Sequence, residues 1–217
     1  MPFDPSRGLV EFTATVNGST CGRFGIDTGA DRLYLDRAFA ARAGIKISSE
    51  NPSAVVRGLK GTSIVGGASV RSFTIGDQAL YNIPVEIIDI GALSDNQNAP
   101  DGLVGYDALS RFYITLDYPK QTINLFTTEP PFLRDKDAVF ATVPFTLSGH
   151  FIMVKVVLDD GVVGNFFVDF CASVSVLSPT LLKSVGLSPD ADDYVTIKRA
   201  SIGDVTAKQV VDRKSVV

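Results

Sequence analysis

The chain contains one pattern twice: an apolar segment, a polar turn, and a second apolar segment that ends in an aspartate. In the first copy, residues 10–16 alternate apolar and polar side chains, an Asn-Gly turn follows, and the chain returns to Asp27. In the second copy, residues 151–168 have the same order and lead to Asp169. A period of two predicts half-buried strands, and the turn residues predict antiparallel hairpins. Each hairpin therefore delivers a carboxylate to a turn beside the core.

The two copies keep the same register beyond the aspartates. The aspartates are 142 positions apart, and Gly44 and Gly186 are separated by the same number. Before each glycine stands a residue that can cap a short helix, Asp36 in the first copy and Ser178 in the second. Serine and aspartate are favoured N-caps, and glycine is common directly after a helix. The sequence therefore predicts two short helices at matching places in a duplicated fold.

The repeat predicts an all-β fold with two lobes and short helices. Residues 1–127 form the expected first lobe, and residues 138–217 form the second. Residues 128–137, with two prolines and several charges, are the expected linker. We expect the second lobe to be incomplete, because nothing after residue 211 matches residues 101–126 of the first copy.

Composition excludes several classes of function. Apolar residues make up 45% of the chain and charged residues 20%, and the net charge is −4, so the sequence predicts a globular protein without the basic face that nucleic acid requires. Apolar runs are far shorter than the roughly 18 residues of a membrane span. Two cysteines and one histidine predict neither a metal site nor a cofactor. The start lacks the order of a secretory signal, which leaves a cytoplasmic protein or a truncated start as alternatives.

Three features of the first copy occur together. Residues 27–30 (Asp-Thr-Gly-Ala) follow an apolar strand, residues 55–65 form two β-rich arms around glycines, and residues 103–105 are Leu-Val-Gly. In this order they resemble the pepsin and retropepsin superfamily of aspartic proteases, and the resemblance covers most of residues 8–126. It implies lobes built as closed β-barrels and an endopeptidase that hydrolyses an extended polypeptide through an aspartate-activated water.

The resemblance also implies roles for individual residues. Two aspartates share one proton in this family, because two close carboxylates cannot both ionise cheaply. Asp27 would be one of them and Asp169 the other. Thr28, Gly29 and Ala30 would support the aspartate loop. The expected flap over the substrate is formed by Gly58, Leu59, Lys60 and Gly61.

The second copy departs from the motif, and this leaves alternatives open. Phe170 stands at the position of Thr28, and Cys171 stands at that of Gly29. One hypothesis is a monomer with Asp27 and Asp169 as the pair, and another is a homodimer in which two first lobes bring two copies of Asp27 together. A third is a catalytically inactive peptide-binding or structural module. A fourth is that the sequence is a fragment whose missing part completes the second lobe.

Overall fold

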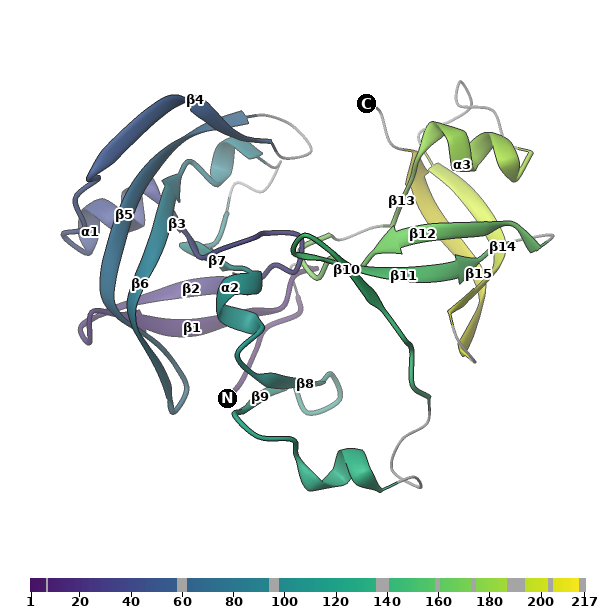
Figure 1. The fold of residues 1–217 in the computed structure, drawn as a ribbon, viewed down its shortest axis with the longest axis horizontal. Helices are drawn as coiled ribbons and strands as arrows, with labels where there is room; N and C mark the ends of the chain where they lie inside the picture. The colour runs from purple at the N-terminus through teal and green to yellow at the C-terminus, as the bar shows by residue number, and fades with distance from the viewer. Residues whose placement is uncertain are drawn as a thin grey trace. The chain divides into compact units, whose positions relative to one another are not determined.

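The computed structural model describes residues 1–6, 8–57, 62–93, 98–135, 141–158, 161–172, 175–186, 194–202 and 205–214. These residues are mostly β-strand and fall into two compact units, Met1–Glu129 and Pro130–Val217 (Figure 1). Each unit is described below by itself.

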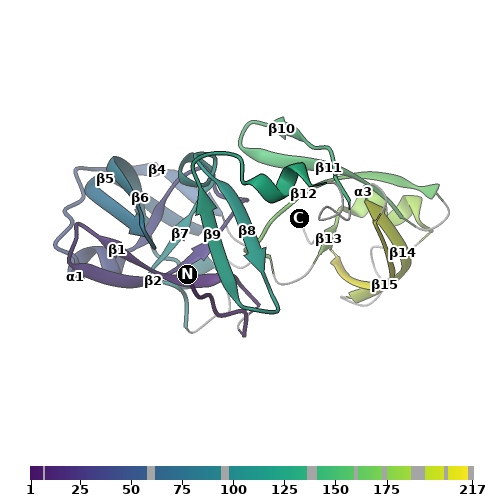
Figure 2. The ribbon, with the colours of Figure 1, turned by 90° about the horizontal axis from the view of Figure 1, so that it is seen from below.

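The first unit contains nine strands and three short helical segments among its described residues. The strands are β1 (Glu11–Val16), β2 (Thr20–Ile26), β3 (Tyr34–Asp36), β4 (Ser49–Arg57), β5 (Thr62–Ile75), β6 (Gln78–Ile88), β7 (Gly102–Val104), β8 (Tyr113–Asp117) and β9 (Thr122–Phe126). The helical segments are α1 (Arg37–Arg42), η1 (Gly91–Leu93) and α2 (Tyr106–Leu109). Figure 2 shows β8 and β9 side by side as a separate antiparallel hairpin.

Six strands of the first unit close into a barrel. Their order is β1-β2-β7-β3-β6-β5, and β5 pairs again with β1, while β4 extends the sheet from β5. Aromatic side chains fill the interior: the ring of Phe24 makes edge-to-face contacts with those of Phe39 and Phe73, and all three residues are fully buried. The closed barrel predicted for the first lobe is confirmed.

The β1–β2 hairpin brings the first aspartate to its place. Asn17 and Gly18 have φ angles of 54° and 74°, which suit a tight hairpin turn and explain the Asn-Gly pair, and residues 17–19 connect the two strands. The register joins Val16 to Thr20 and Glu11 to Gly25, so β2 runs through the barrel wall and ends at Ile26, directly before Asp27. The predicted hairpin is therefore present with the predicted turn.

The β4–β5 hairpin corresponds to the predicted glycine-bearing arms. Val55 pairs with Ile64 and Val56 with Ser63. The Ser63 hydroxyl, which is buried, accepts a hydrogen bond of 2.8 Å from the backbone N–H of Asp89, so the hairpin is joined to the loop after β6. Figure 1 shows β4, β5 and β6 side by side. The predicted flap tip, residues 58–61, lies outside the described residues.

Helix α1 begins as predicted, at an aspartate cap. Asp36 Oδ1 accepts the backbone N–H of Ala38 at 2.9 Å, and Oδ2 accepts that of Ile90 at 3.2 Å. The helix ends before Gly44, whose φ of 66° suits glycine. The Asp36 carboxylate thus caps α1 and also holds the backbone directly after β6 by a hydrogen bond.

We expect Asp36→Ala to destabilise the first unit by about 2 kcal/mol, because it removes a helix cap and a second hydrogen bond to the backbone. Ser178→Ala is a matched control, since Ser178 caps α3 (Pro179–Ser184) through one hydrogen bond, to Leu181 N–H. It should cost about 1 kcal/mol. Urea unfolding of both variants measures the difference, and equal losses would contradict the double role of Asp36.

The second unit is smaller and its described strands form an open sheet. The strands are β10 (Thr146–Ser148), β11 (Phe151–Val157), β12 (Val163–Phe167), β13 (Val176–Leu177), β14 (Tyr194–Ile202) and β15 (Val205–Lys214), with η2 (Pro131–Arg134) and α3 as helical segments. The pairing runs β12-β11-β14-β15-β13, and β10 also pairs with β11. Leu158, Leu177 and Leu182 form its small buried core.

Candidate active site

Asp27 lies at the end of β2, in a turn that holds its carboxylate by backbone hydrogen bonds. Asp27 Oδ1 accepts the N–H groups of Gly29 at 2.9 Å and Ala30 at 3.0 Å. The N–H of Asp27 donates to the carbonyl of Val104 at 3.0 Å. Thr28, between Asp27 and Gly29 in the sequence, is 9% exposed. The loop therefore fixes a half-buried carboxylate at the edge of the barrel.

A second segment, β7 with the start of α2, supports this loop from beneath. Tyr106 N–H donates to the Ala30 carbonyl at 2.9 Å, and Asp107 N–H donates to the Asp31 carbonyl at 3.1 Å. A Cβ on Gly105 would clash with the Arg32 carbonyl and lie 2.7 Å from the Ala30 carbonyl oxygen. Only glycine allows this close approach of two backbone segments.

Asp101 anchors β7 beside β2. Its Oδ2 accepts the backbone N–H of Arg23 at 2.9 Å, and its Oδ1 pairs with Arg42 Nη2 at 2.9 Å. The backbone N–H of Asp101 donates to the Arg23 carbonyl, and its carbonyl accepts the Asp36 N–H. These backbone hydrogen bonds hold the start of β7 against β2 and β3.

A charged cluster that sequence reasoning missed follows the aspartate loop. Tyr34 Oη donates to Asp31 Oδ1 at 2.7 Å, Arg32 Nε donates to Asp31 Oδ2 at 3.0 Å, and Arg32 Nη1 lies 2.8 Å from Glu86 Oε1. In the sequence, the feature that could have indicated this cluster is the pair Asp31 and Arg32, directly after residues 27–30. The pairing with Glu86 depends on the parallel register of β3 and β6, which brings Tyr34 opposite Glu86.

The pKa values of Asp31, in the cluster, and of its neighbour Asp107 are shifted in opposite directions. Burial raises the pKa of Asp31, but hydrogen bonds from Tyr34 and Arg32 outweigh it and leave the pKa below its ordinary value. Burial raises the pKa of Asp107, whose buried Oδ1 has no hydrogen-bond partner among the described residues. Asp31 therefore keeps its charge to a lower pH than an ordinary aspartate, whereas Asp107 takes up a proton at a higher pH.

Asp169, at the end of the β12 strand in the second unit, occupies a similar local turn. Cys171 N–H donates to Asp169 Oδ1 at 2.7 Å, and Ala172 N–H donates to the Asp169 carbonyl at 3.4 Å. Burial raises the pKa of the Asp169 carboxyl above its ordinary value, although the backbone N–H groups partly oppose it. Phe170 is 36% exposed, and Cys171 is half-buried and forms no disulfide. The substitutions at these two positions therefore leave the hydrogen bond to the carboxylate in place.

This pKa shift gives a sign for the pH dependence of stability. The folded-state pKa of Asp169 is above its ordinary value of 3.8. The stability that the protonated Asp169 carboxyl contributes to the folded protein is therefore fully present below pH 3.8, and it is lost as the pH rises through the folded-state pKa. Asp169→Asn removes the titration. We expect the variant to gain stability relative to the wild type as the pH rises from below 3.8 through the folded-state pKa of Asp169, measured by chemical unfolding.

Asp117→Asn is the control of opposite sign. The backbone N–H of Lys120 lowers the pKa of this carboxyl, so its contribution to stability is present above the ordinary value and is lost as the pH falls. The variant should therefore lose stability relative to the wild type as the pH rises. The same trend in both variants would contradict the assignment for Asp169.

The structure places the described site residues in two groups. Asp27, Thr28, Gly29 and Ala30 form one loop of the first unit. Asp169 belongs to the second unit. The predicted flap residues, Gly58, Leu59, Lys60 and Gly61, lie outside the described residues.

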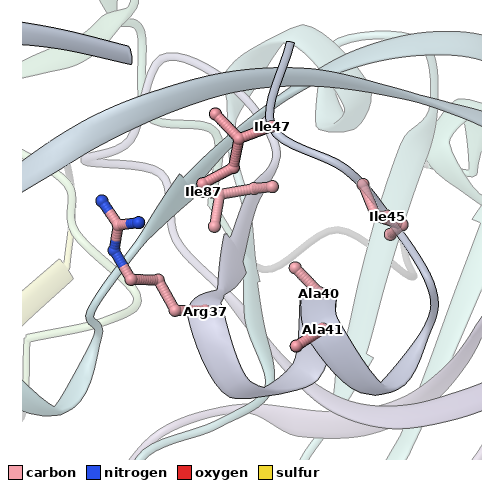
Figure 3. Close-up of a pocket in the computed structure, with 6 residues that line it drawn as sticks. All are labelled: Arg37, Ala40, Ala41, Ile45, Ile47 and Ile87. Carbon is pink, nitrogen blue, oxygen red and sulfur yellow. The ribbon is translucent and has the colours of Figure 1, made fainter. Parts of the chain in front are cut away.

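Two hollows of the first unit lie away from Asp27. One has a volume of about 130 Å³ and lies between α1 and β6, with Arg37 at one side of Ile45, Ile47 and Ile87 (Figure 3). The other, of about 470 Å³, lies beside the first residues of β5, towards the turn end of the β4–β5 hairpin, and is lined by Arg37, Thr62, Ser63, Ile64, Asp89 and Ala92. Neither is lined by Asp27.

Metal-ligand clusters and membrane-spanning helices are both absent from the described part of the chain. No cluster of three or more histidine, cysteine, aspartate or glutamate side chains there could hold a metal ion. Its helices are all too short or too polar to cross a membrane.

Comparison with known proteins gives one family match. Residues 12–108 match a family model described as "Aspartyl protease". No curated protein matches the chain.

Solved structures of proteins from different sources are similar to part of this chain. A retropepsin-like aspartic protease from Rickettsia conorii is 20% identical, with 58% of this chain and 86% of that chain covered and a TM-score of 0.42. The retroviral protease-like domain of Ddi1 from Leishmania major is 15% identical, with 54% and 87% covered and a TM-score of 0.40. EIAV protease in complex with the inhibitor HBY-793 is 19% identical, with 47% and 86% covered and a TM-score of 0.36.

Proposed function

Since residues 12–108 match a family model described as "Aspartyl protease", we propose that the protein is an aspartic endopeptidase and that Asp27 is one of its two catalytic carboxylates. The observation that carries the proposal is the Asp27 loop, in which the N–H groups of Gly29 and Ala30 hold one carboxylate oxygen. Such fixation orients the carboxylate before substrate arrives, which lowers the cost of reaching the reactive geometry.

The proposed mechanism needs a second carboxylate near the first. Two close carboxylates share one proton, so one acts as a base towards water while the other, protonated, polarises the carbonyl of the scissile peptide bond. The proton that the base has taken from water then passes to the nitrogen of the leaving amine. No metal or cofactor is part of this proposal.

We propose Asp169 as the second carboxylate in a monomeric enzyme. Its support is local: the Asp169 carboxylate accepts the N–H two residues ahead, as Asp27 accepts that of Gly29, and each aspartate follows the second strand of a hairpin. The raised pKa of Asp169 suits the protonated member of the pair. The duplication of the lobe is part of this proposal.

A homodimer through the first unit is the alternative arrangement of the same chemistry. Two copies of Asp27 would then meet across a two-fold axis, and Asp169 would have no part in the reaction. Thr28 favours this alternative, because it is buried at the loop where its counterpart Phe170 has no hydroxyl.

A different function, an inactive peptide-binding module, also follows from Phe170 and Cys171. Phe170 removes a hydroxyl, and the Cys171 side chain occupies a turn position where the first loop has glycine. In that case the barrel would keep an extended peptide under the predicted flap without cutting it.

One experiment separates these hypotheses. The purified protein is incubated at mildly acid pH with a chemically unfolded protein, and new peptide ends are identified by mass spectrometry. Cleavage that is lost in Asp169→Asn supports the monomeric pair, whereas cleavage retained in Asp169→Asn, together with a dimeric mass, supports the homodimer. Absence of cleavage with retained peptide binding supports the inactive module.

A further inference from the structure

Asp107 lies on α2, at the contact between this helix and the loop that follows Asp27. Its backbone N–H donates to the Asp31 carbonyl at 3.1 Å, next to the hydrogen bond from Tyr106 N–H to the Ala30 carbonyl. The same loop holds the Asp27 carboxylate, since the N–H of Ala30 donates to Asp27 Oδ1 at 3.0 Å. Asp107 is thus connected to the Asp27 loop through neighbouring backbone hydrogen bonds.

The side chain of Asp107 is unfavourable at this contact when it is charged. Its Oδ1 is buried and has no hydrogen-bond partner among the described residues. A buried carboxylate oxygen without a partner costs free energy, because it has lost its hydration. The protonated carboxyl costs less, and an asparagine of nearly the same shape would carry no charge at all. The carboxyl therefore makes this contact depend on pH, which a neutral side chain would not do.

The groups that act on the Asp107 carboxyl come from both sides of the contact. Burial raises its pKa above the ordinary value of 3.8, and the like charge of Asp31, from the loop, adds to this. The N–H of Ala108, Arg111 from the turn after α2, and Arg32 from the loop act in the opposite direction. Arg32 is also paired with Asp31, and Arg111 Nε donates to the Asp107 carbonyl at 3.0 Å. Burial therefore outweighs the two arginines.

We propose that Asp107 is a positioning residue that makes the Asp27 loop depend on pH: its protonation keeps α2 docked on the loop, and its ionisation favours their separation. When α2 separates from the loop, water reaches the Asp107 carboxylate, and the N–H groups of Tyr106 and Asp107 lose the loop carbonyls that they bind. The loop that orients Asp27 is therefore held most firmly in acid.

Docking of α2 and protonation of Asp107 are linked. With α2 docked the pKa of Asp107 is raised, and with α2 separated the hydrated carboxyl has its ordinary pKa of 3.8. The docking free energy that the protonated carboxyl contributes is therefore fully present below pH 3.8, and it is lost as the pH rises through the docked-state pKa. The pKa of Asp31 is lowered, so its own contribution is present above pH 3.8 and is lost as the pH falls below that value. The two carboxyls therefore act in different ranges of pH.

In the proposed endopeptidase, docking of α2 holds the loop that orients Asp27, and this step rests on the proposed function. The rate of cleavage by Asp107→Asn, divided by the wild-type rate at the same pH, should therefore increase as the pH rises above 3.8. Titration of the catalytic carboxylates cancels in this ratio, because both proteins contain them. A ratio that does not change with pH would contradict the effect on catalysis.

The direct test is amide hydrogen exchange of the full chain, followed by NMR without substrate from below pH 3.8 to neutral pH. The amides of Gly29, Ala30 and Tyr106 report on the loop, and those of residues 70–83, on the β5–β6 hairpin, are the reference for global stability. In the wild type, protection of the loop relative to the reference should fall as the pH rises through the docked-state pKa of Asp107. The total fall should be about tenfold for each pKa unit between the docked and separated states.

Three variants separate this inference from a purely structural role, which would change protection equally at every pH. Asp107→Asn should abolish the fall, because the amide keeps the shape of the side chain and cannot ionise. Asp77→Asn, the same change in the exposed turn between β5 and β6, should behave as the wild type. Arg111→Gln removes a cation that favours the carboxylate, so the fall should move to a higher pH. This last variant keeps the test decisive if Asp107→Asn does not fold.

The inference would be overturned by wild-type protection that does not change above pH 3.8, by the same fall in Asp107→Asn, or by a fall in Arg111→Gln at the wild-type pH. These results are read without substrate, so they are independent of whether the protein cuts peptides. A protein that cuts nothing would contradict the endopeptidase proposal and leave the link between Asp107 and the loop in place.

Discussion

Gly105→Ala should destabilise the first unit by about 3 kcal/mol or more and should abolish cleavage. The added Cβ would clash with the Arg32 carbonyl and lie 2.7 Å from both Arg32 N and the Ala30 carbonyl oxygen. These are backbone atoms of the loop that follows Asp27, so they cannot move away as a flexible side chain can. Separation of the two segments would also break the hydrogen bond from Tyr106 N–H to the Ala30 carbonyl.

Gly25→Ala is the matched control for this prediction. Gly25 lies in β2, two residues before Asp27, and a Cβ there would meet only Leu103 Cδ2 at 3.5 Å, an ordinary contact. Urea unfolding and the cleavage assay should show a small effect in Gly25→Ala and a large one in Gly105→Ala. Similar losses in the two variants would mean that Gly105 does not support the aspartate loop through close approach.

Asp27→Asn should lower the rate of cleavage by about 10³-fold or more while the fold is retained. The asparagine side-chain oxygen can still accept the N–H groups of Gly29 and Ala30, so the loop keeps its hydrogen bonds. The amide cannot ionise, however, and therefore cannot take a proton from water. Kinetics on a defined peptide and an unfolding curve for the same sample measure the two effects.

Asp77→Asn provides the comparison, because Asp77 is an exposed residue of the turn between β5 and β6. It makes the same chemical change away from the loop and should leave the rate unchanged. An Asp27→Asn protein that keeps the wild-type rate would exclude Asp27 from the reaction in both the monomer and the homodimer.

Local signals in the sequence were sufficient to predict much of the first unit. The Asn-Gly pair predicted the turn between β1 and β2, and Asp36 predicted the start of α1, because turns and caps depend on neighbouring residues. The aspartate loop could be predicted for the same reason, since Asp27 accepts hydrogen bonds from the next few residues.

Contacts between distant segments could not be predicted from these signals. The ion pair of Arg32 with Glu86 and the anchoring of Asp101 by Arg42 depend on the register of strands that the sequence does not state. The extent of β15, over Val205–Lys214, was also missed, because its alternation is interrupted by charged residues. Whether Asp169 serves as the second carboxylate stays a proposal.

The most direct test of the central claim is whether the wild-type protein cuts an unfolded protein at mildly acid pH in a reaction that needs Asp27. The account predicts new peptide ends in the wild-type sample, their absence in Asp27→Asn, and inhibition by a statine-type mimic of the tetrahedral intermediate. A wild-type protein that yields no new peptide ends between about pH 3 and about pH 7 would contradict it.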